Sequence, residues 1–341
     1  MTDATTLAEL WPVPTAVLVA LFLWWFCTGL LFWLGRHLAG RHASAGLFGG
    51  ALLLAPSLLG LSAVAEDTTV AGAYLSFFCG LGAWSFVELT FLAGALTGPV
   101  RRPCPAGMIG WPRFRLALGT VLWHELAIVA VGAVMLWISL GAPNQTGAWT
   151  FVLLTVMRIS AKLNLFLGLP YPPVALLPAH LSHLESYFRV RRFTALLPAA
   201  ITAGTALATL IAWHAAAPGL DPFHATAYAL FWTLLVLGVA EHWFLILPVR
   251  ESALWHWFIG PAPHGAAVLG PAPASHPGSH AAEGRPAPGL VRRLRDFVRP
   301  PHARDRLSAL GSIHPRTAYD AQPVAGQNQP TGEAAPSPHQ A

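Results

Sequence analysis

The chain has 341 residues, of which 55% are hydrophobic and 10% are charged, and its mean hydropathy is +0.53. Soluble domains carry about 25% charged residues, so this composition excludes an ordinary soluble globular protein and indicates a membrane protein. The formal net charge of +5 follows the predicted membrane topology, so we expect no nucleic-acid partner.

Apolar runs long enough to cross a bilayer recur along most of the chain. A membrane helix needs about 20 mainly apolar residues. No basic segment precedes the first run, so we expect a retained span rather than a cleaved signal peptide. The predicted fold is all-α, a polytopic bundle of about seven transmembrane helices within residues 13–258. The predicted spans are about 13–34, 44–65, 70–97, 116–141, 148–169, 194–216 and 223–248.

Basic residues outside the predicted spans fall in alternate loops. The loops between them are acidic or uncharged, and the segment 1–12 contains only acidic charges, Asp3 and Glu9. Because Lys and Arg accumulate on the cytoplasmic side, we predict a periplasmic N-terminus and a cytoplasmic C-terminus. The basic loop residues are Arg36, Arg41, Arg101, Arg102, Arg113, Arg115, Arg189, Arg191 and Arg192.

Residues 259–341 have a different composition. This predicted cytoplasmic tail is rich in Pro, Ala, Gly and His, contains Arg, and lacks the apolar residues that a packed core requires, so most of it is predicted to be disordered. The segment Leu290–Leu310 could form a basic helix on an anionic leaflet, and it is equally consistent with a solvated charged tail.

Ionisable residues interrupt four of the predicted spans at a common depth. An ionisable residue at the centre of a bilayer costs roughly 2.5–3.5 kcal/mol on insertion scales. Such residues therefore pair with a partner that offsets this cost, or they serve a function. At 1.5 Å per helical residue, one residue of each span lies roughly 9–14 Å from the predicted cytoplasmic boundary: Glu88, His124, Lys162 and Glu241. The predicted polar layer comprises Glu88, His124, Glu125, Arg158, Lys162, Asn164, Glu241 and His242.

The loop after the fifth span adds two imidazoles to this layer. A helical pattern starts at Pro178 and places Leu181, Leu184 and Phe188 on one face. His180 and His183 are three residues apart, so they are neighbours on a helix and could point at the polar layer.

Three interpretations of the layer remain open. In the first, it is structural: Glu88, Glu125 and Glu241 pair with Arg158 and Lys162, because intramembrane charges usually pair with one another. In this interpretation the histidines have backbone or side-chain partners, and the layer holds the helices together.

In the second interpretation, the layer binds a transition metal, iron or zinc, because bundle metal sites use Glu and His from facing helices. The sequential pairs His124–Glu125 and Glu241–His242 diverge by about 100° on a helix, which weakens this pattern. Arg158, Lys162, Asn164 and His183 would support the site without ligating the metal. The candidate ligands are Glu88, His124, Glu125, His180, Glu241 and His242.

In the third interpretation, the layer handles a pigment or relays protons. A neutral imidazole in an apolar span can ligate the magnesium of a chlorin, and His124 and His242 are the candidates for that cofactor-binding role. Neither histidine is specific for a pigment, so this interpretation also stays open.

Four stretches carry a resemblance to a known family. Residues 65–128, which include "WSFVELTF" and "VLWHELAI", resemble the photosynthetic complex assembly protein 2 family, PuhE. Residues 141–171, "HLSHLESYF" and "AEHWFLILP" are similar to the same family, and the likeness extends over about 13–258.

The resemblance implies a multi-pass protein of the inner, cytoplasmic or intracytoplasmic, membrane of purple phototrophic bacteria. It implies assembly of the reaction centre and light-harvesting complex and modulation of bacteriochlorophyll supply. The implied partners are the lipid bilayer, reaction-centre or light-harvesting subunits, and bacteriochlorophyll or its biosynthetic enzymes. It assigns no catalytic residue, and the alternative is an integral-membrane metalloenzyme that acts on a pigment or lipid precursor from the cytoplasmic side.

Overall fold

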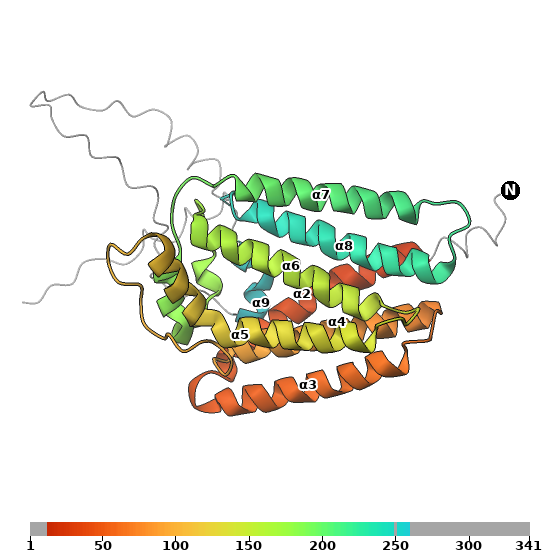
Figure 1. The fold of residues 1–341 in the computed structure, drawn as a ribbon, viewed down its shortest axis with the longest axis horizontal. Helices are drawn as coiled ribbons and strands as arrows, with labels where there is room; N and C mark the ends of the chain where they lie inside the picture. Colours follow the sequence, from red (N-terminus) through yellow and green to blue (C-terminus); the bar gives the residue numbers. More distant parts are fainter. Residues whose placement is uncertain (1–11, 249–250, 260–341) are drawn as a thin grey trace, which may run out of the picture. The chain divides into compact units, whose positions relative to one another are not determined.

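The computed structural model describes residues 12–248 and 251–259, and helices dominate this part of the chain (Figure 1). Within it, seven helices are long and apolar enough to cross a membrane. The prediction of an all-α, multi-pass membrane protein is therefore confirmed. The seven helices are α2 Pro12–His37, α3 Ala43–Ala63, α4 Val70–Leu92, α5 Gly110–Ile138, α6 Thr146–Leu167, α7 Leu196–Ala215 and α8 Pro222–Phe244.

Short helices fill the connections and the end of the described chain. The segment after α8 packs against α2: the Trp25 indole donates to the Leu254 carbonyl over 2.9 Å, and the Trp255 indole donates to the Trp25 carbonyl over 3.1 Å. The short elements are η1 Gly40–His42, η2 Val174–Leu176, η3 Ala179–Tyr187, η4 Glu251–Trp255 and α9 His256–Ile259. The tail beyond these, with the predicted basic segment 290–310, lies outside the described residues, as does most of the segment 1–12.

The boundaries of the third and fourth spans differ from those predicted. Helix α4 ends at Leu92 rather than near Thr97, because Gly94 takes a φ of +81° and the Ala95 amide bonds back to the Thr90 carbonyl over 2.9 Å. Helix α5 begins at Gly110 rather than near residue 116. Proline is tolerated in the first helical turn, so Pro112 does not prevent the earlier start.

Helices α4 and α8 form the interior of the bundle. Of their most apolar stretches, 61% and 50% are buried, against 11–22% for the other five helices. Helix α4 contacts α2, α3, α5, α6 and α8, and α8 contacts α2, α4, α6 and α7. The outer helices therefore direct most of their apolar side chains toward the surrounding lipid, as expected where the solvent is a bilayer.

Hydrogen bonds between loops hold the connections together at each end of the bundle. At one end, the Asn144 side chain donates to the carbonyls of Val64, Asp67 and Gly72 over 2.9–3.1 Å. At the other end, the Tyr187 hydroxyl donates to the Arg102 carbonyl over 3.1 Å. The predicted alternation of loops between two ends of the bundle agrees with these contacts.

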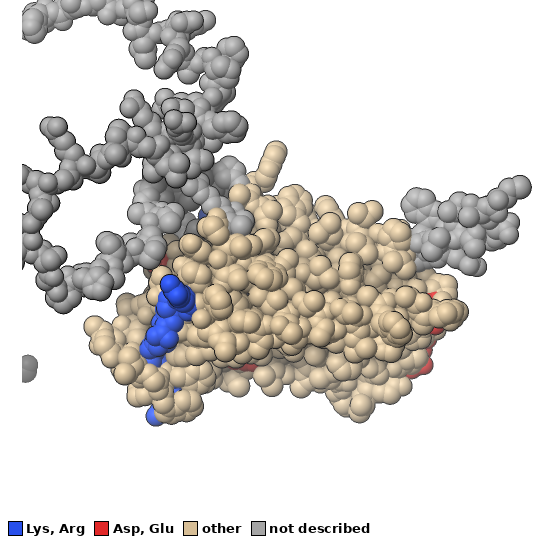
Figure 2. Space-filling view, turned by 90° about the horizontal axis from the view of Figure 1, so that it is seen from above, with Lys and Arg blue, Asp and Glu red and all other residues tan. Residues whose placement is uncertain are grey.

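Charge is segregated along the bundle. Figure 2 shows Lys and Arg side chains at one end of the visible face and most of the visible acidic side chains at the opposite end, with mainly uncharged surface between them. Arg101, Arg102 and Arg192 are exposed at the first end, and Glu66 is exposed at the second. This separation is the pattern on which the predicted orientation rests, and the orientation itself stays a prediction.

The loop pattern that begins at Pro178 forms a 3-10 helix, η3, rather than an α-helix. A 3-10 helix has three residues per turn, so side chains at every third position share a face. Leu181, Leu184 and Tyr187 are accordingly the buried row. The prediction of Phe188 in this row was wrong by one position, although Phe188 still packs against the same cluster.

Candidate functional site

Two neighbouring cavities lie inside the bundle. The smaller, of about 150 Å³, lies among α2, α4, α6 and α8, and the larger, of about 480 Å³, lies between α5, α6 and the segment 173–188. Phe32, Leu92, Arg158 and Ala161 line both. The charged residue Arg158 therefore stands where the two cavities meet.

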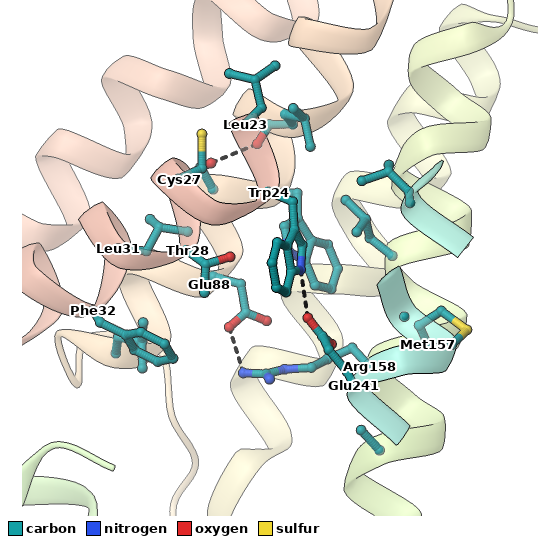
Figure 3. A pocket seen from close by; sticks show the side chains of 18 residues that line it. Leu23, Trp24, Cys27, Thr28, Leu31, Phe32, Glu88, Met157, Arg158 and Glu241 are labelled. Carbon is teal, nitrogen blue, oxygen red and sulfur yellow. Dashed lines mark hydrogen bonds and ion pairs between the residues drawn. The ribbon is translucent and has the colours of Figure 1, made fainter. Parts of the chain in front are cut away.

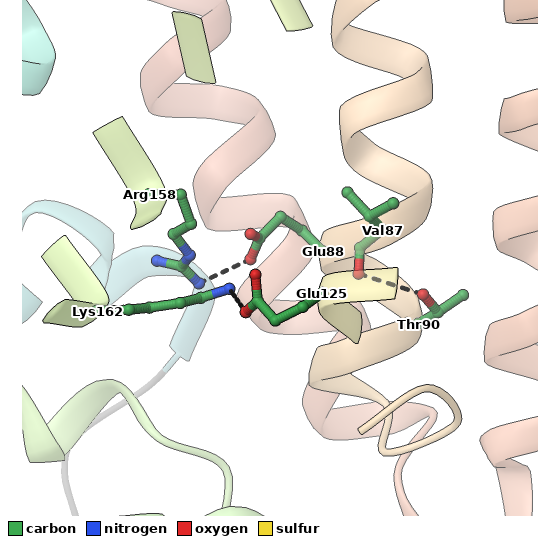
Figure 4. Close-up of polar contacts among 6 residues, drawn as sticks. All are labelled: Val87, Glu88, Thr90, Glu125, Arg158 and Lys162. Carbon is green, nitrogen blue, oxygen red and sulfur yellow. Dashed lines mark hydrogen bonds and ion pairs between the residues drawn. The ribbon is translucent and has the colours of Figure 1, made fainter. Parts of the chain in front are cut away.

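Two ion pairs join three helices beside these cavities. A guanidinium nitrogen of Arg158 on α6 lies 2.7 Å from Glu88 Oε2 on α4, and Lys162 Nζ on α6 lies 2.6 Å from Glu125 Oε1 on α5 (Figure 4). Arg158 and Lys162 are four residues apart, which places them on one face of α6. The cations of α6 thus bind the carboxylates of two neighbouring helices.

The third intramembrane carboxylate has a neutral partner. Glu241 on α8 lines the smaller cavity, and the Trp24 indole on α2 donates to its Oε1 over 2.7 Å (Figure 3). Glu88 and Arg158 line the same cavity. Three of the predicted polar-layer residues are therefore brought together there.

His242 is held by hydrogen bonds on both sides of its ring. Its Nδ1 lies 2.8 Å from the Gly238 carbonyl, and its Nε2 lies 2.9 Å from the Ser160 hydroxyl. A carbonyl only accepts, so Nδ1 carries the proton and Ser160 donates to Nε2. Both ring nitrogens are therefore engaged: the Gly238 contact lies within α8, and the Ser160 contact joins α8 to α6. The Asn164 side chain donates to the Ser160 carbonyl over 3.0 Å, a bond within α6.

His124 has no such partners. Its side chain is fully buried on α5, its ring centroid lies 4.5 Å from that of Phe91, and neither ring nitrogen has a hydrogen-bond partner among the described residues. It is absent from the lining of both cavities described above. The structure therefore places it apart from its sequence neighbour Glu125, which faces the larger cavity.

The two loop histidines lie at the end of the bundle rather than in the layer. The His180 ring packs against Gly94, and His183 is half-buried. Burial lowers the pKa of both imidazoles, and nearby Arg101 lowers it further, while backbone hydrogen bonding at Leu92 partly offsets the shift at His180. Both are therefore expected to be neutral at pH 7.

The structure shows polar contacts that the sequence analysis did not anticipate. Trp24 and Ser160 are not among the predicted polar-layer residues, and Arg113 is predicted in a loop. Arg113 instead lies on α5 and is buried, with its guanidinium donating to the Phe166 and Tyr187 carbonyls and lying 4.1 Å from the centre of the Phe166 ring. The early start of α5 causes this difference, and Pro112 was the available signal.

The candidate metal ligands are distributed among separate contacts. Glu88 and Glu125 bind different cations, Glu241 binds an indole, and His242 binds a hydroxyl and a carbonyl. Within residues 12–248 and 251–259, no group of three or more His, Cys, Asp or Glu side chains is placed to hold a metal ion. The arrangement suits a network of paired charges next to an apolar cavity.

Comparison with known proteins gives two matches. The family described as "Protein of unknown function (DUF3623)" matches residues 11–265. A Rhodobacter capsulatus protein, described as "Uncharacterized 30.4 kDa protein in puhA 5'region", is 37% identical over 248 residues, which cover 71% of this chain and 89% of that protein. No solved structure matches the chain. Since the family match spans most of the described bundle, the chain belongs to the DUF3623 family.

Proposed function

We propose that this protein is an assembly factor for the photosynthetic reaction centre and light-harvesting complex in the inner membrane of a phototrophic bacterium. The observation that carries the proposal is the relative in the puhA 5' region of Rhodobacter capsulatus. A position beside a photosynthesis gene favours a role in the same apparatus. The proposal includes the identification of this family with PuhE, which the residues around Glu88 and Glu125 suggested.

The fold is compatible with binding a hydrophobic component within the bilayer. Seven apolar helices give the protein extensive contact with lipid and with other membrane helices. The ion pairs of α6 fix three helices in register, and the larger cavity offers an apolar space beside them. Such a bundle can hold a hydrophobic component, either a nascent subunit or bacteriochlorophyll, away from unproductive contacts.

The test is deletion of the gene in its phototrophic host, followed by complementation. We expect the deletion strain grown under phototrophic conditions to contain less reaction-centre and light-harvesting complex, measured by near-infrared absorbance of membranes. Wild-type protein should restore the absorbance. Expression of the same chain with Arg158→Gln alone should restore less, because Glu88 on α4 is then left as a buried carboxylate without its cation.

Pigment analysis separates the two forms of the proposal. If free bacteriochlorophyll persists while complexes are lost, the protein acts on assembly; if bacteriochlorophyll falls and its precursors accumulate, it acts on pigment supply. Normal levels of both complexes and pigment in the deletion strain would contradict the proposed function.

A further inference from the structure

We propose that the larger cavity binds an amphiphile consisting of an apolar body and a single carboxylate, with the carboxylate received by Arg158 and Lys162. This site does not depend on the proposed function. Its evidence is the volume, the lining and the charged end of the cavity between α5, α6 and the segment 173–188.

The volume and lining of the cavity suit a small apolar molecule. Its volume of about 480 Å³ falls in the range of roughly 300–1,000 Å³ that ligand sites occupy, and such sites are mainly apolar with a few convergent polar groups. Most of the lining is aliphatic or aromatic. Helix α5 contributes Phe114, Leu118 and Val121, α6 contributes Ile159, Leu163 and Phe166, and the segment 173–188 contributes Leu177, Leu184 and Phe188.

The charged end of the cavity is rich in unused hydrogen-bond donors. A guanidinium has five N–H donors and an ammonium has three. Glu88 binds one guanidinium nitrogen of Arg158, and Arg158 Nε is buried without a partner among the described residues. Glu125 receives one hydrogen bond from Lys162. Figure 4 shows the charged ends of both cationic side chains pointing toward Glu88 and Glu125, so a further carboxylate at this end could bind both cations.

The unused donors of the two cations, rather than a net positive charge, favour a carboxylate, because Arg158 is also paired with Glu88 outside this lining. Two cations, Arg158 and Lys162, and one carboxylate, Glu125, line this cavity. A carboxylate matches the planar donor fork of a guanidinium, and charge-assisted bonds of this kind are the stronger class of hydrogen bond. A long-chain fatty acid and a tetrapyrrole acid share this chemistry, and competition between them distinguishes the two sources.

The cavity is open to ligands that arrive from the hydrocarbon. Leu118, Ile159 and Leu163 line it and are also among the exposed large hydrophobic residues, with 37–41% of their surface accessible. The exposed surface of these outer helices faces lipid in a membrane. An apolar molecule can therefore enter between α5 and α6 without passing through water.

The experiment uses full-length protein in phosphatidylcholine nanodiscs. The probe is a photoreactive palmitic acid with a diazirine in its chain, and the matched probe is the corresponding alcohol. At alkaline pH, where the membrane-bound carboxyl group is ionised, we expect the acid to label peptides of α5 and α6 that line the cavity, as mapped by mass spectrometry. The acid should label them about tenfold more than the alcohol, the factor expected for one added charge-assisted hydrogen bond.

Two variants of α5 separate the cavity from the general lipid surface. Leu118→Trp fills the cavity and should abolish most of the labelling. Leu136→Trp is the control, because Leu136 is exposed to a similar degree, 45% against 40% for Leu118, and does not line the cavity. The two positions are 18 residues apart, about five turns, so they lie on the same face of the helix. Labelling of the control should equal that of the wild type.

A third variant tests the charged end. Lys162→Met combined with Glu125→Gln removes both members of an ion pair, so it leaves no unpaired charge. The preference for the acid over the alcohol should decrease, while labelling by the alcohol persists. Competition by oleate but not by a chlorin acid identifies a lipid ligand, and the reverse identifies a tetrapyrrole. Equal labelling by acid and alcohol in the wild type, or wild-type labelling in Leu118→Trp, would overturn the site.

Discussion

At the scale of single residues, the ion pairs of α6 gain energy from the attraction between opposite charges and lose energy because the charges are removed from water. Arg158 and Lys162 lie in a bundle that crosses lipid, where a charge without a partner is strongly unfavourable. Removing one member of a buried pair costs about 3–5 kcal/mol, whereas replacing both by neutral groups is often tolerated. Because the pair of Lys162 and Glu125 faces a cavity and keeps 22–24% of its side-chain surface accessible, the lower end of that range applies.

A double-mutant cycle tests this expectation on Lys162 and Glu125. We expect Lys162→Met and Glu125→Gln each to lower the stability of the protein in detergent, by about 3 kcal/mol. The double variant should lose less than the sum of the two, because neither charge is left unpaired. The measurement is reversible unfolding by denaturant in mixed micelles. Strict additivity of the two losses would show that this contact contributes no coupling.

The two histidines of η3 give a pH prediction. Burial lowers the pKa of His180 and His183 below their ordinary value of 6.5, so the unfolded chain binds protons more readily than the folded one. Their contribution to stability is complete above that value and is lost as the pH falls below it toward the folded pKa. We therefore expect the thermal midpoint of the purified protein to fall on acidification through this range.

The control for this effect is the pair His180→Asn and His183→Gln in one chain. These amides do not titrate, so the variant should show a smaller decrease over the same pH interval. An unchanged pH dependence would assign the effect to other groups, such as the carboxylates of the opposite end.

At the scale of elements, close backbone contact fixes the segment after α4 onto α5. The Val100 amide donates to the Gly119 carbonyl, and the His124 amide donates to the Thr97 carbonyl, both over 3.1 Å. A Cβ placed on Gly98 would lie 2.1 Å from the Gly119 oxygen. Glycine is therefore required at residue 98, because backbone atoms cannot move aside as a flexible side chain can.

We predict that Gly98→Ala destabilises the protein by about 1–3 kcal/mol, the usual cost of overpacking. Thermal unfolding in detergent provides the measurement. Gly49→Ala on α3 is the matched control, since a Cβ there meets no atom within 4 Å. Alanine favours a helix over glycine by up to about 1 kcal/mol, so the control should be neutral or slightly stabilising. Equal effects of the two substitutions would exclude the proposed contact.

At the scale of the whole molecule, the separation of charge predicts the orientation in the membrane. The end that carries Arg101, Arg102 and Arg192 should face the cytoplasm, and the end that carries Glu66 should face the periplasm. Four loop glycines with positive φ have open space around them, and two lie at each end, so short insertions there should be tolerated. They are Gly40, Gly107, Gly141 and Gly219.

The prediction is tested with a protease site inserted after each of these glycines in turn. In spheroplasts, cleavage should occur after Gly141 and Gly219, and the sites after Gly40 and Gly107 should be protected until the membrane is opened. The opposite pattern of protection would show that all seven helices have the reverse orientation in the membrane.

The polar layer shows how far residue-level reasoning reaches. Equal depth along the helices made pairing of Arg158 and Lys162 with the carboxylates of the layer one of three open interpretations, since an intramembrane charge needs a partner. The structure pairs them with Glu88 and Glu125. Depth does not specify rotation about the helix axis. For that reason the sequence could not separate His124, which packs against Phe91, from Glu125, which binds Lys162. It also could not identify the Trp24 indole as the partner of Glu241.

The sequence by itself determined the fold class, the number of spans and the alternation of basic loops, because each depends on the local cost of placing apolar or charged residues in lipid. Only the tertiary structure decided the pairing of charges, the early start of α5, the 3-10 geometry of η3 and the cavity between α5 and α6. These features depend on which faces of the helices meet and on where backbones approach closely. Such contacts join residues far apart in the chain, so no local pattern specifies them.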